Sequence, residues 1–358
     1  MKNAVRMVFV LLAAALLLLS GCAGIGPTTV DRDRFDYTVA IGDSWKSQML
    51  LNMVKMRYGD APIFLDVASV ISQYEIQGTV DLGASWSSSP YSAGQTIGAH
   101  GTYADRPTIT YSPLTGERFA KSLMTPISPS TILNLVQTGN PIDLVFRLCV
   151  SSINGIRNRY GGRARAHSAD PEFYPLLEKM KGIQATEGIG MRVKKVDDRE
   201  AIVLIFRGKV DPATEAASAD VRGVLGLDPA AREFKVVYDS VATGDKEIAI
   251  LSRSLLEIIV DLASNIEVPE VHVTEKRVSP AFKDEPTVGV TVPPLFRVQS
   301  SPQRSADAFV SVYYRNHWFW IDDRDVMSKT LFSFLMFVFT LTETGGKESA
   351  PIVTVPTR

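Results

Sequence analysis

The stretch IQGTVDLGASWSSSPYSAGQTIGAHGTY, from Ile76 to Tyr103, decides the fold class of the N-terminal half of this 358-residue chain. In its first arm Val80 and Leu82 alternate with polar or small residues, and the same period of two returns after the loop rich in Ser, Pro and Gly. Alternation on both sides of such a loop is typical of two antiparallel strands. The sequence therefore predicts a long β-hairpin over residues 76–111.

Helical patterns surround this hairpin. Apolar residues recur at helical spacing in WKSQMLLNMVKMRYGD before it, and in SPSTILNLVQTG and PIDLVFRLCVSSINGIRNRYGG after it. From residue 188 shorter patterns predict two strands in GMRVKKVDDREAIVLIFR, a helix in SRSLLEIIVDLASNIEVP, a strand in VHVTEKRV and a hairpin in DAFVSVYYRNHWFWIDDRD. We therefore expect an α+β fold: a helical region at 37–187 that carries the hairpin, and a region at 188–358 with a mixed or antiparallel sheet packed by helices.

Residues 1–21 look like a signal peptide. Lys2 and Arg6 give a positively charged start, and the thirteen apolar residues from Met7 to Leu19 are too few to span a bilayer as a helix. The motif LSGC that follows resembles the lipobox of bacterial lipoproteins. This resemblance implies cleavage before Cys22, acylation of Cys22 with palmitate among its lipids, and a lipidated tether over 22–36. The alternative is an ordinary secretory signal whose cysteine is incidental.

The lipobox resemblance also implies a location. Buried methylenes contribute roughly 0.8 kcal/mol each, so several acyl chains anchor a protein permanently. In such lipoproteins Asp after the lipidated cysteine favours the inner membrane, and this chain has Ala23 there. We therefore expect an outer-membrane protein on the periplasmic face, bound through its lipid, with protein partners or copies of itself as further contacts. The net charge of −1 gives no indication of a nucleic-acid partner.

The body resembles a family of bacterial lipoproteins that brings no known activity. Four segments carry this resemblance: LLNMVKMRYGDAPIFLDV, YSPLTGERFAKSLMTPISPS, RSLLEIIVDLASNIEVP and DAFVSVYYRNHWFWIDDRD. They are spread over most of the chain after Cys22. The resemblance implies one continuous fold and a membrane location, and it transfers no catalytic residue.

The segment YTVAIGDSWKSQML, from Tyr37 to Leu50, raises the question of catalysis. An apolar strand followed by Gly-Asp-Ser resembles the nucleophile block of GDSL-type serine hydrolases. Those enzymes take their base from an Asp-x-x-His block, and none of the four histidines here has Asp three positions before it. The simpler interpretation is that Asp43 or Ser44 caps a helix that begins at this point, which stabilises it by about 1 kcal/mol.

Other chemical patterns are weak. The histidines are scattered without metal-ligand spacing, and Cys149 lies in an apolar run where we expect a buried, unreactive thiol, so we expect no metal and no cofactor. Asp322, Asp323 and Asp325 follow the predicted strand WFWI. They could act on a glycan with the two tryptophans as stacking platforms, or they could charge the start of the last helix while the tryptophans face the core.

A basic surface with one aromatic residue is the best candidate binding surface in the sequence. Its members are Arg157, Arg159, Tyr160, Arg163 and Arg165. Such a surface suits anionic head groups or cell-wall polymers. The alternative is that these arginines complement the C-terminal dipole of a helix that ends at Gly161 and Gly162.

These patterns leave three hypotheses for function. The leading one is a non-catalytic, lipid-anchored scaffold or assembly partner in the periplasm, with no catalytic residues. The second is an oligomeric pore or secretion component, because each arm of hairpin 76–111 approaches the 9–11 residues of a membrane-spanning strand. One hairpin cannot close a ring of strands, whereas a ring of copies could. The third is a cell-wall glycan hydrolase that uses the cluster around Asp322.

Overall fold

The computed structural model confirms the predicted α+β fold class, with helices beside mixed and antiparallel sheets. It describes residues 25–71, 74–85, 94–105, 108–162, 165–196, 199–281 and 295–343. Over these residues, no helix combines the length and the apolar character needed to cross a membrane. The chain divides into two compact units, of which the first is Met1–Trp45 with Leu65–Pro113 and the second is Lys46–Phe64 with Leu114–Arg358.

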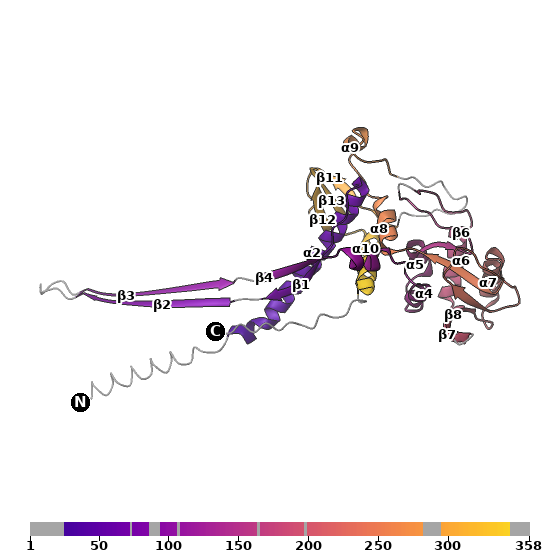
Figure 1. The fold of residues 1–358 in the computed structure, drawn as a ribbon, viewed down its shortest axis with the longest axis horizontal. Helices are drawn as coiled ribbons and strands as arrows, with labels where there is room; N and C mark the ends of the chain where they lie inside the picture. The colour runs from indigo at the N-terminus through magenta and orange to yellow at the C-terminus, as the bar shows by residue number, and fades with distance from the viewer. Residues whose placement is uncertain are drawn as a thin grey trace, which may run out of the picture. The chain divides into compact units, whose positions relative to one another are not determined.

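The first unit holds the start of α2 and two separate two-stranded antiparallel sheets (Figure 1). The strands are β1 (Leu65–Ile71), β2 (Tyr74–Ser85), β3 (Gly94–Asp105) and β4 (Thr108–Pro113). β1 pairs with β4, and β2 pairs with β3 over twelve consecutive residue pairs without a register shift. The predicted hairpin is therefore confirmed. Its loop, including Trp86, lies outside the described residues.

The described side chains of the first unit are exposed or only partly buried. Of its described side chains, none belongs to the buried core. Phe35 and Val39 of α2 are 70% and 64% exposed, and Ile109 and Tyr111 of β4 are 40% and 53% exposed. Folding needs buried apolar area to offset the conformational entropy of the chain, and an isolated two-stranded hairpin is marginal in water. The side chains that the structure describes in this unit therefore form no hydrophobic core.

Helix α2 runs from Ile25 to Tyr58. It begins well before the predicted start, so the interpretation of Asp43 or Ser44 as a helix cap is wrong, and residues 25–36 of the predicted tether are helical. Pro27 falls in the first turn, where a missing backbone N–H leaves no hydrogen bond unmade. No other proline follows before the helix ends at Tyr58, so the helix continues through Gly42.

The second unit contains a six-stranded mixed sheet and a three-stranded antiparallel sheet. The larger sheet has the order β6-β5-β10-β9-β8-β7, with β9 and β10 parallel and the other neighbours antiparallel. Its strands are β5 (Val150–Ile153), β6 (Ile156–Arg157), β7 (Ile189–Val196), β8 (Arg199–Phe206), β9 (Glu233–Val237) and β10 (Glu247–Ser252). This sheet combines strands from both sides of residue 188, where the sequence suggested a change of region.

The smaller sheet has the order β11-β13-β12. Its strands are β11 (Gln299–Ser301), β12 (Ala308–Tyr314) and β13 (His317–Asp322). The predicted hairpin of β12 and β13 is confirmed and turns at Arg315 and Asn316, whose φ angles are 48° and 66°. Phe319 and Ile321 form the buried face of β13, so the expectation that the two tryptophans of WFWI face the core is wrong.

Helices complete the second unit. They are α3 (Gly116–Phe119), which continues into the π-helical turn η1 (Ala120–Met124), then α4 (Pro129–Gln137), α5 (Ile142–Cys149), α6 (Phe173–Ala185), α7 (Pro212–Val224), α8 (Leu255–Ala263), α9 (Glu270–Thr274) and α10 (Val326–Glu343). Ser254 and Glu257 form a capping box at the start of α8, and Asp211 caps α7. VHVTEKRV forms α9 and the following turn, and not the predicted strand. The helices and both sheets share one hydrophobic core.

The segment after α5 also differs from the prediction. The helix expected to continue to Gly161 ends at Cys149, and the chain turns back through β5 and β6. Asn154 and Gly155 form the turn with φ angles of 45° and 84°, which Asn and Gly adopt more readily than other residues. This hairpin places the predicted basic surface beside β10 and α8 instead of at a helix end.

Candidate binding site

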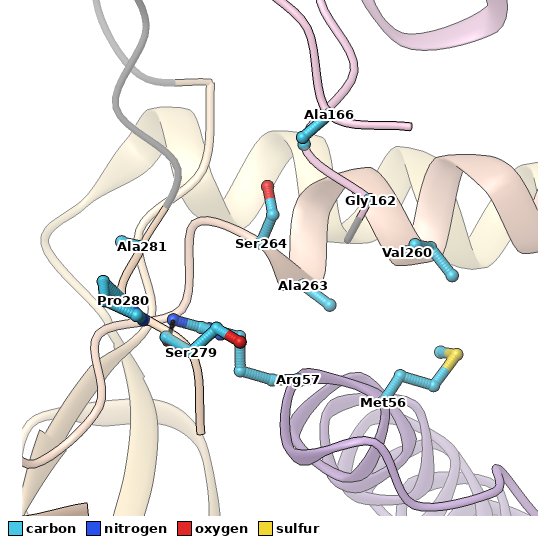
Figure 2. A pocket seen from close by; sticks show the side chains of 11 residues that line it. Met56, Arg57, Gly162, Ala166, Val260, Ala263, Ser264, Ser279, Pro280 and Ala281 are labelled. Atoms are coloured by element: carbon cyan, nitrogen blue, oxygen red, sulfur yellow. Dashed lines mark hydrogen bonds between the residues drawn. The ribbon is translucent and has the colours of Figure 1, made fainter. Parts of the chain in front are cut away.

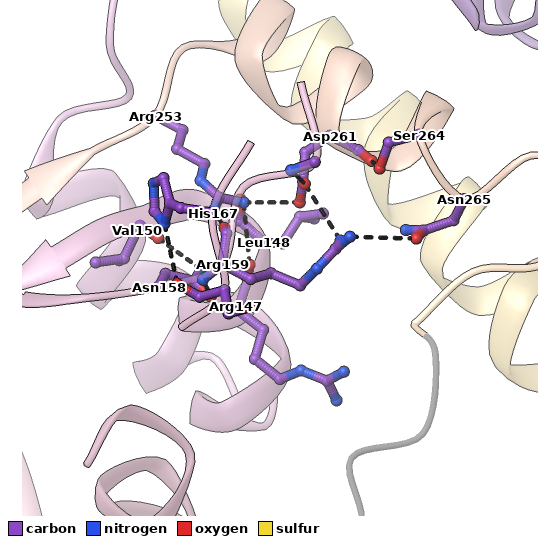
Figure 3. Close-up of polar contacts among 12 residues, drawn as sticks. Arg147, Leu148, Val150, Asn158, Arg159, His167, Arg253, Asp261, Ser264 and Asn265 are labelled. Atoms are coloured by element: carbon purple, nitrogen blue, oxygen red, sulfur yellow. Dashed lines mark hydrogen bonds and ion pairs between the residues drawn. The ribbon is translucent and has the colours of Figure 1, made fainter. Parts of the chain in front are cut away.

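A buried charge cluster lies where the segment after β6 meets α8. Asp261 of α8 accepts hydrogen bonds from the backbone N–H of Gly161 at 2.6 Å, from Arg159 Nη1 at 3.2 Å and from Arg253 Nη1 at 3.1 Å (Figure 3). Both carboxylate oxygens are used, since Oδ1 binds Gly161 and Arg159 while Oδ2 binds Arg253. One carboxylate of α8 therefore holds together the residue that follows β10 and the segment after β6.

Arg253 is the most deeply buried charged residue of this cluster. Its side chain is 2% exposed, and its guanidinium also donates to the backbone carbonyl of Arg159. The guanidinium lies over the ring of Tyr160, 5.7 Å from the centroid. Charges taken out of water are stable only when they are paired and hydrogen-bonded. The ion pair with Asp261 and the contact with the Tyr160 ring stabilise this charge, although Nε of Arg253 is buried without a hydrogen-bond partner.

Asn158 and a short backbone bridge fix the rest of the segment. Asn158 is buried and donates Nδ2 to the carbonyls of Arg147 at 2.9 Å and Val150 at 2.8 Å. Beyond it, Tyr160 and His167 exchange two backbone hydrogen bonds of 2.9 Å. These contacts hold both ends of the intervening loop.

Two glycines allow this segment to approach its neighbours closely. A Cβ at Gly161 would lie 2.0 Å from Ser264 Oγ and 2.7 Å from Ser264 Cβ. A Cβ at Gly162 would lie 2.4 to 2.7 Å from the ring and hydroxyl of Tyr160. The reason for both glycines is thus steric contact, and not the helix termination that the sequence suggested.

A cavity of about 440 Å³ opens beside the charge cluster. Its lining comes from β5, from the segment after β6, from the end of β10 with the residue that follows it, and from α8. The members are Ser151, Asn158, Tyr160, Gly162, Arg165, His167, Leu251, Arg253, Glu257 and Val260. Burial, together with the charges of Glu257 and Asp261, raises the pKa of Tyr160, so its hydroxyl stays protonated. The cavity combines hydrogen-bond donors with one carboxylate, a lining suited to a polar ligand.

A second cavity, of about 330 Å³, shares Gly162 and Val260 with the first. Figure 2 shows Met56 and Arg57 of α2 across this space from Ala263 and Ser264. Arg57 is buried and donates to the carbonyl of Ser279 at 2.8 Å. The Arg57 guanidinium already donates hydrogen bonds to backbone carbonyls. The smaller cavity therefore offers a ligand fewer polar groups than the larger one.

The structure separates the residues of the predicted basic surface. Tyr160 and Arg165 meet at the larger cavity, whereas Arg159 is only 12% exposed and points to Asp261. Arg157 is exposed and pairs with Asp170 at 3.0 Å, and this hydrogen bond raises the pKa of Arg157. Arg163 lies outside the described residues. The sequence did not predict Arg253, Asp261, His167 and Glu257 as members of this site. The signal that could have identified two of them is the presence of charged residues, Arg253 and Asp261, within an apolar run.

A second polar cluster joins α2, α9 and the β12–β13 hairpin. The hydroxyl of Tyr58 and Nδ1 of buried His272 are 2.7 Å apart, and the rings of His272 and His317 lie 5.0 Å apart at their centroids. Burial raises the pKa of Tyr58 to about 12. Burial, and then the nearby His317 and Arg277, lower the pKa of His272. Both groups are therefore neutral around pH 7.

The remaining candidate catalytic groups have structural surroundings. Ser44 is exposed within α2, and not at the strand-to-helix turn that the resemblance to GDSL-type hydrolases implies. Cys149 is buried, as predicted, and burial raises the pKa of its thiol to about 12. Within the described ranges, no three His, Cys, Asp or Glu side chains gather closely enough to hold a metal ion.

The acidic cluster before α10 is engaged locally. Asp325 accepts from the N–H of Ser328 at 3.0 Å and from its hydroxyl at 2.8 Å, so it caps α10. Asp323 pairs with Lys329 at 2.7 Å, and Asp322 accepts from the N–H of Arg324 at 2.8 Å. Each carboxylate thus has a structural partner of the kind expected at a helix start.

No protein-family model, curated protein or solved structure matches this chain.

Proposed function

We propose that this chain is a lipid-anchored outer-membrane protein that acts as a non-catalytic scaffold or assembly partner in the periplasm. The lipobox motif LSGC, which ends at Cys22, supports the anchor. One structural observation supports the scaffold role: no described side chain of the first unit belongs to a buried core, although that unit holds two antiparallel ladders. Apolar and backbone groups left uncovered in this way suit contact with another molecule.

The candidate catalytic groups have structural contacts or are buried, which supports this proposal. Asp325 caps a helix, Asp323 pairs with Lys329, and Cys149 is enclosed in the core. The larger cavity then serves as a recognition pocket, in which the Tyr160 hydroxyl and the Arg165 guanidinium bind polar groups of a partner.

The anchor is tested by palmitate labelling of cells that express the full chain, followed by fractionation. Cys22→Ala should abolish labelling and release the protein from the membrane fraction. The matched control is Cys149→Ala, which removes the other cysteine and should leave the label in place. Membrane retention of Cys22→Ala would refute the anchor. Ala23→Asp tests the choice of membrane, and should move the labelled protein to the inner-membrane fraction.

A second candidate, an oligomeric pore or secretion component, is favoured by the length of the hairpin. β2 and β3 each have 12 residues, and tilted strands of about 9–11 residues span a bilayer. Leakage of a small dye from vesicles that carry the purified chain tests this candidate, and intact vesicles at saturating protein would exclude it.

A further inference from the structure

The β2–β3 sheet has two open edges. Its 12 residue pairs run without a break, and no third strand joins it among the strands that the structure describes. In an antiparallel pair each strand directs about half of its backbone N–H and C=O groups toward its partner and half outward. Each edge therefore presents a long row of backbone donors and acceptors, which is a template for another strand.

Neither strand carries the lysines, prolines or bulges that often protect such an edge, and their only charged residues are Glu75, Asp81 and Asp105. Soluble proteins block open edges with Lys, Pro, bulges or very short strands. β2 and β3 contain no Lys, Arg or Pro, their register has no bulge, and each is 12 residues long. The composition of this hairpin thus permits pairing along its whole length.

We infer that the partner of these edges is a second copy of this chain, whose β2 edge pairs with the β3 edge of its neighbour. The strands of the hairpin are antiparallel, so β3 of one copy beside β2 of the next continues the alternation and keeps equivalent faces together. The inference rests on the proposed function at one point, because a shared lipid anchor gives all copies the same orientation. Repeated head-to-tail contacts of this kind close into a ring or extend as a filament.

The test compares the mass of the full lipidated chain in detergent with that of a variant in which residues 74–105 are replaced by a short Gly-Ser link. Native mass spectrometry should show the first as an oligomer and the second as a monomer. The deletion should leave palmitate labelling unchanged, so loss of anchoring and loss of assembly are read separately. A monomeric full chain, or an oligomeric deletion variant, would overturn the inference.

Two proline variants keep the test valid if the deletion misfolds. Of two consecutive strand residues, one directs its N–H outward and the other directs it to the hairpin partner. Thr79→Pro and Val80→Pro therefore include one variant that removes a donor from the outer edge only. That variant should lose the oligomer while its far-ultraviolet circular dichroism stays that of the parent. An unchanged oligomeric mass in both variants would contradict pairing through this edge.

Discussion

Removal of the charge on Asp261 should destabilise the second unit strongly. Asp261→Asn keeps the size of the side chain but leaves the guanidinium groups of Arg159 and Arg253 without their shared carboxylate. Removing one partner of a buried ion pair costs about 3–5 kcal/mol, because the other charge stays buried. We expect the free energy of unfolding to fall by that amount. The weakened hydrogen bond from the backbone N–H of Gly161 contributes to this loss.

The assay is urea unfolding of the purified chain, followed by tryptophan fluorescence. Asp220→Asn is the matched control, because its pair with Lys179 measures 2.8 Å and both side chains are at least 40% exposed. An exposed pair of this kind contributes about 0–1 kcal/mol. If Asp261→Asn and Asp220→Asn lose stability equally, the buried cluster does not have the energetic role assigned to it.

A double-mutant cycle separates the pair from other effects of the substitution. Arg159→Met removes one guanidinium and leaves the carbonyl that accepts from Arg253. Residues that share a hydrogen-bond network couple by about 0.5–3 kcal/mol. Asp261→Asn should therefore cost less in the Arg159→Met background than in the parent. Additive effects within about 0.5 kcal/mol would refute direct coupling.

Three further predictions concern single side chains. Gly161→Ala should lower the free energy of unfolding by about 1–3 kcal/mol, because the added Cβ overlaps with Ser264. Gly182→Ala in α6 has open space around it and should raise that free energy by about 0.5–1 kcal/mol. Equal effects of the two variants in urea unfolding would contradict this prediction. The free energy of unfolding should fall as the pH drops below about 6.5, because the pKa of His272 is lowered in the folded chain and the unfolded chain therefore binds the proton first. For this one group the free energy of unfolding changes by at most about 1.4 kcal/mol per pH unit. His272→Asn should reduce this pH dependence. Cys149 should react with a thiol reagent at pH 8 only after unfolding, since its pKa is about 12 and it is fully buried; rapid labelling of the folded chain would contradict this.

Local patterns in the sequence predicted the parts of the fold that depend on local forces. The period-two alternation around Val80 and Leu82 predicted the β2–β3 hairpin, and the apolar periodicity of SRSLLEIIVDLASNIEVP predicted α8. In both cases a single period is maintained between clear turn or cap residues. The pattern is then sufficient without knowledge of the neighbours.

The failures occurred where the local pattern was ambiguous. The segment from Val150 to Ile153, VSSI, has only four residues and continues the apolar run of α5, and so short a stretch fits a strand or a helix equally well. Its pairing with β10, about a hundred residues later in the chain, decided the outcome. The predicted cap at Ser44 failed because a good cap residue is no evidence against a helix that is already under way.

The candidate site could be predicted only in part, for a related reason. Tyr160 and Arg165 were singled out because basic and aromatic residues are adjacent in the sequence. Asp261, which determines where Arg159 points, is 102 residues away from it. No rule based on local spacing connects those two residues.

The division of the chain into two units has a consequence for the order of events after synthesis. The hydrophobic core draws only on the second unit among the described residues, so it can form in each chain independently, at a rate that dilution does not change. If copies of the chain pair through the β2–β3 hairpin, as inferred above, they meet in a later encounter, whose rate depends on concentration. Dilution during refolding should therefore separate two kinetic phases, of which only the slower responds to the amount of protein present.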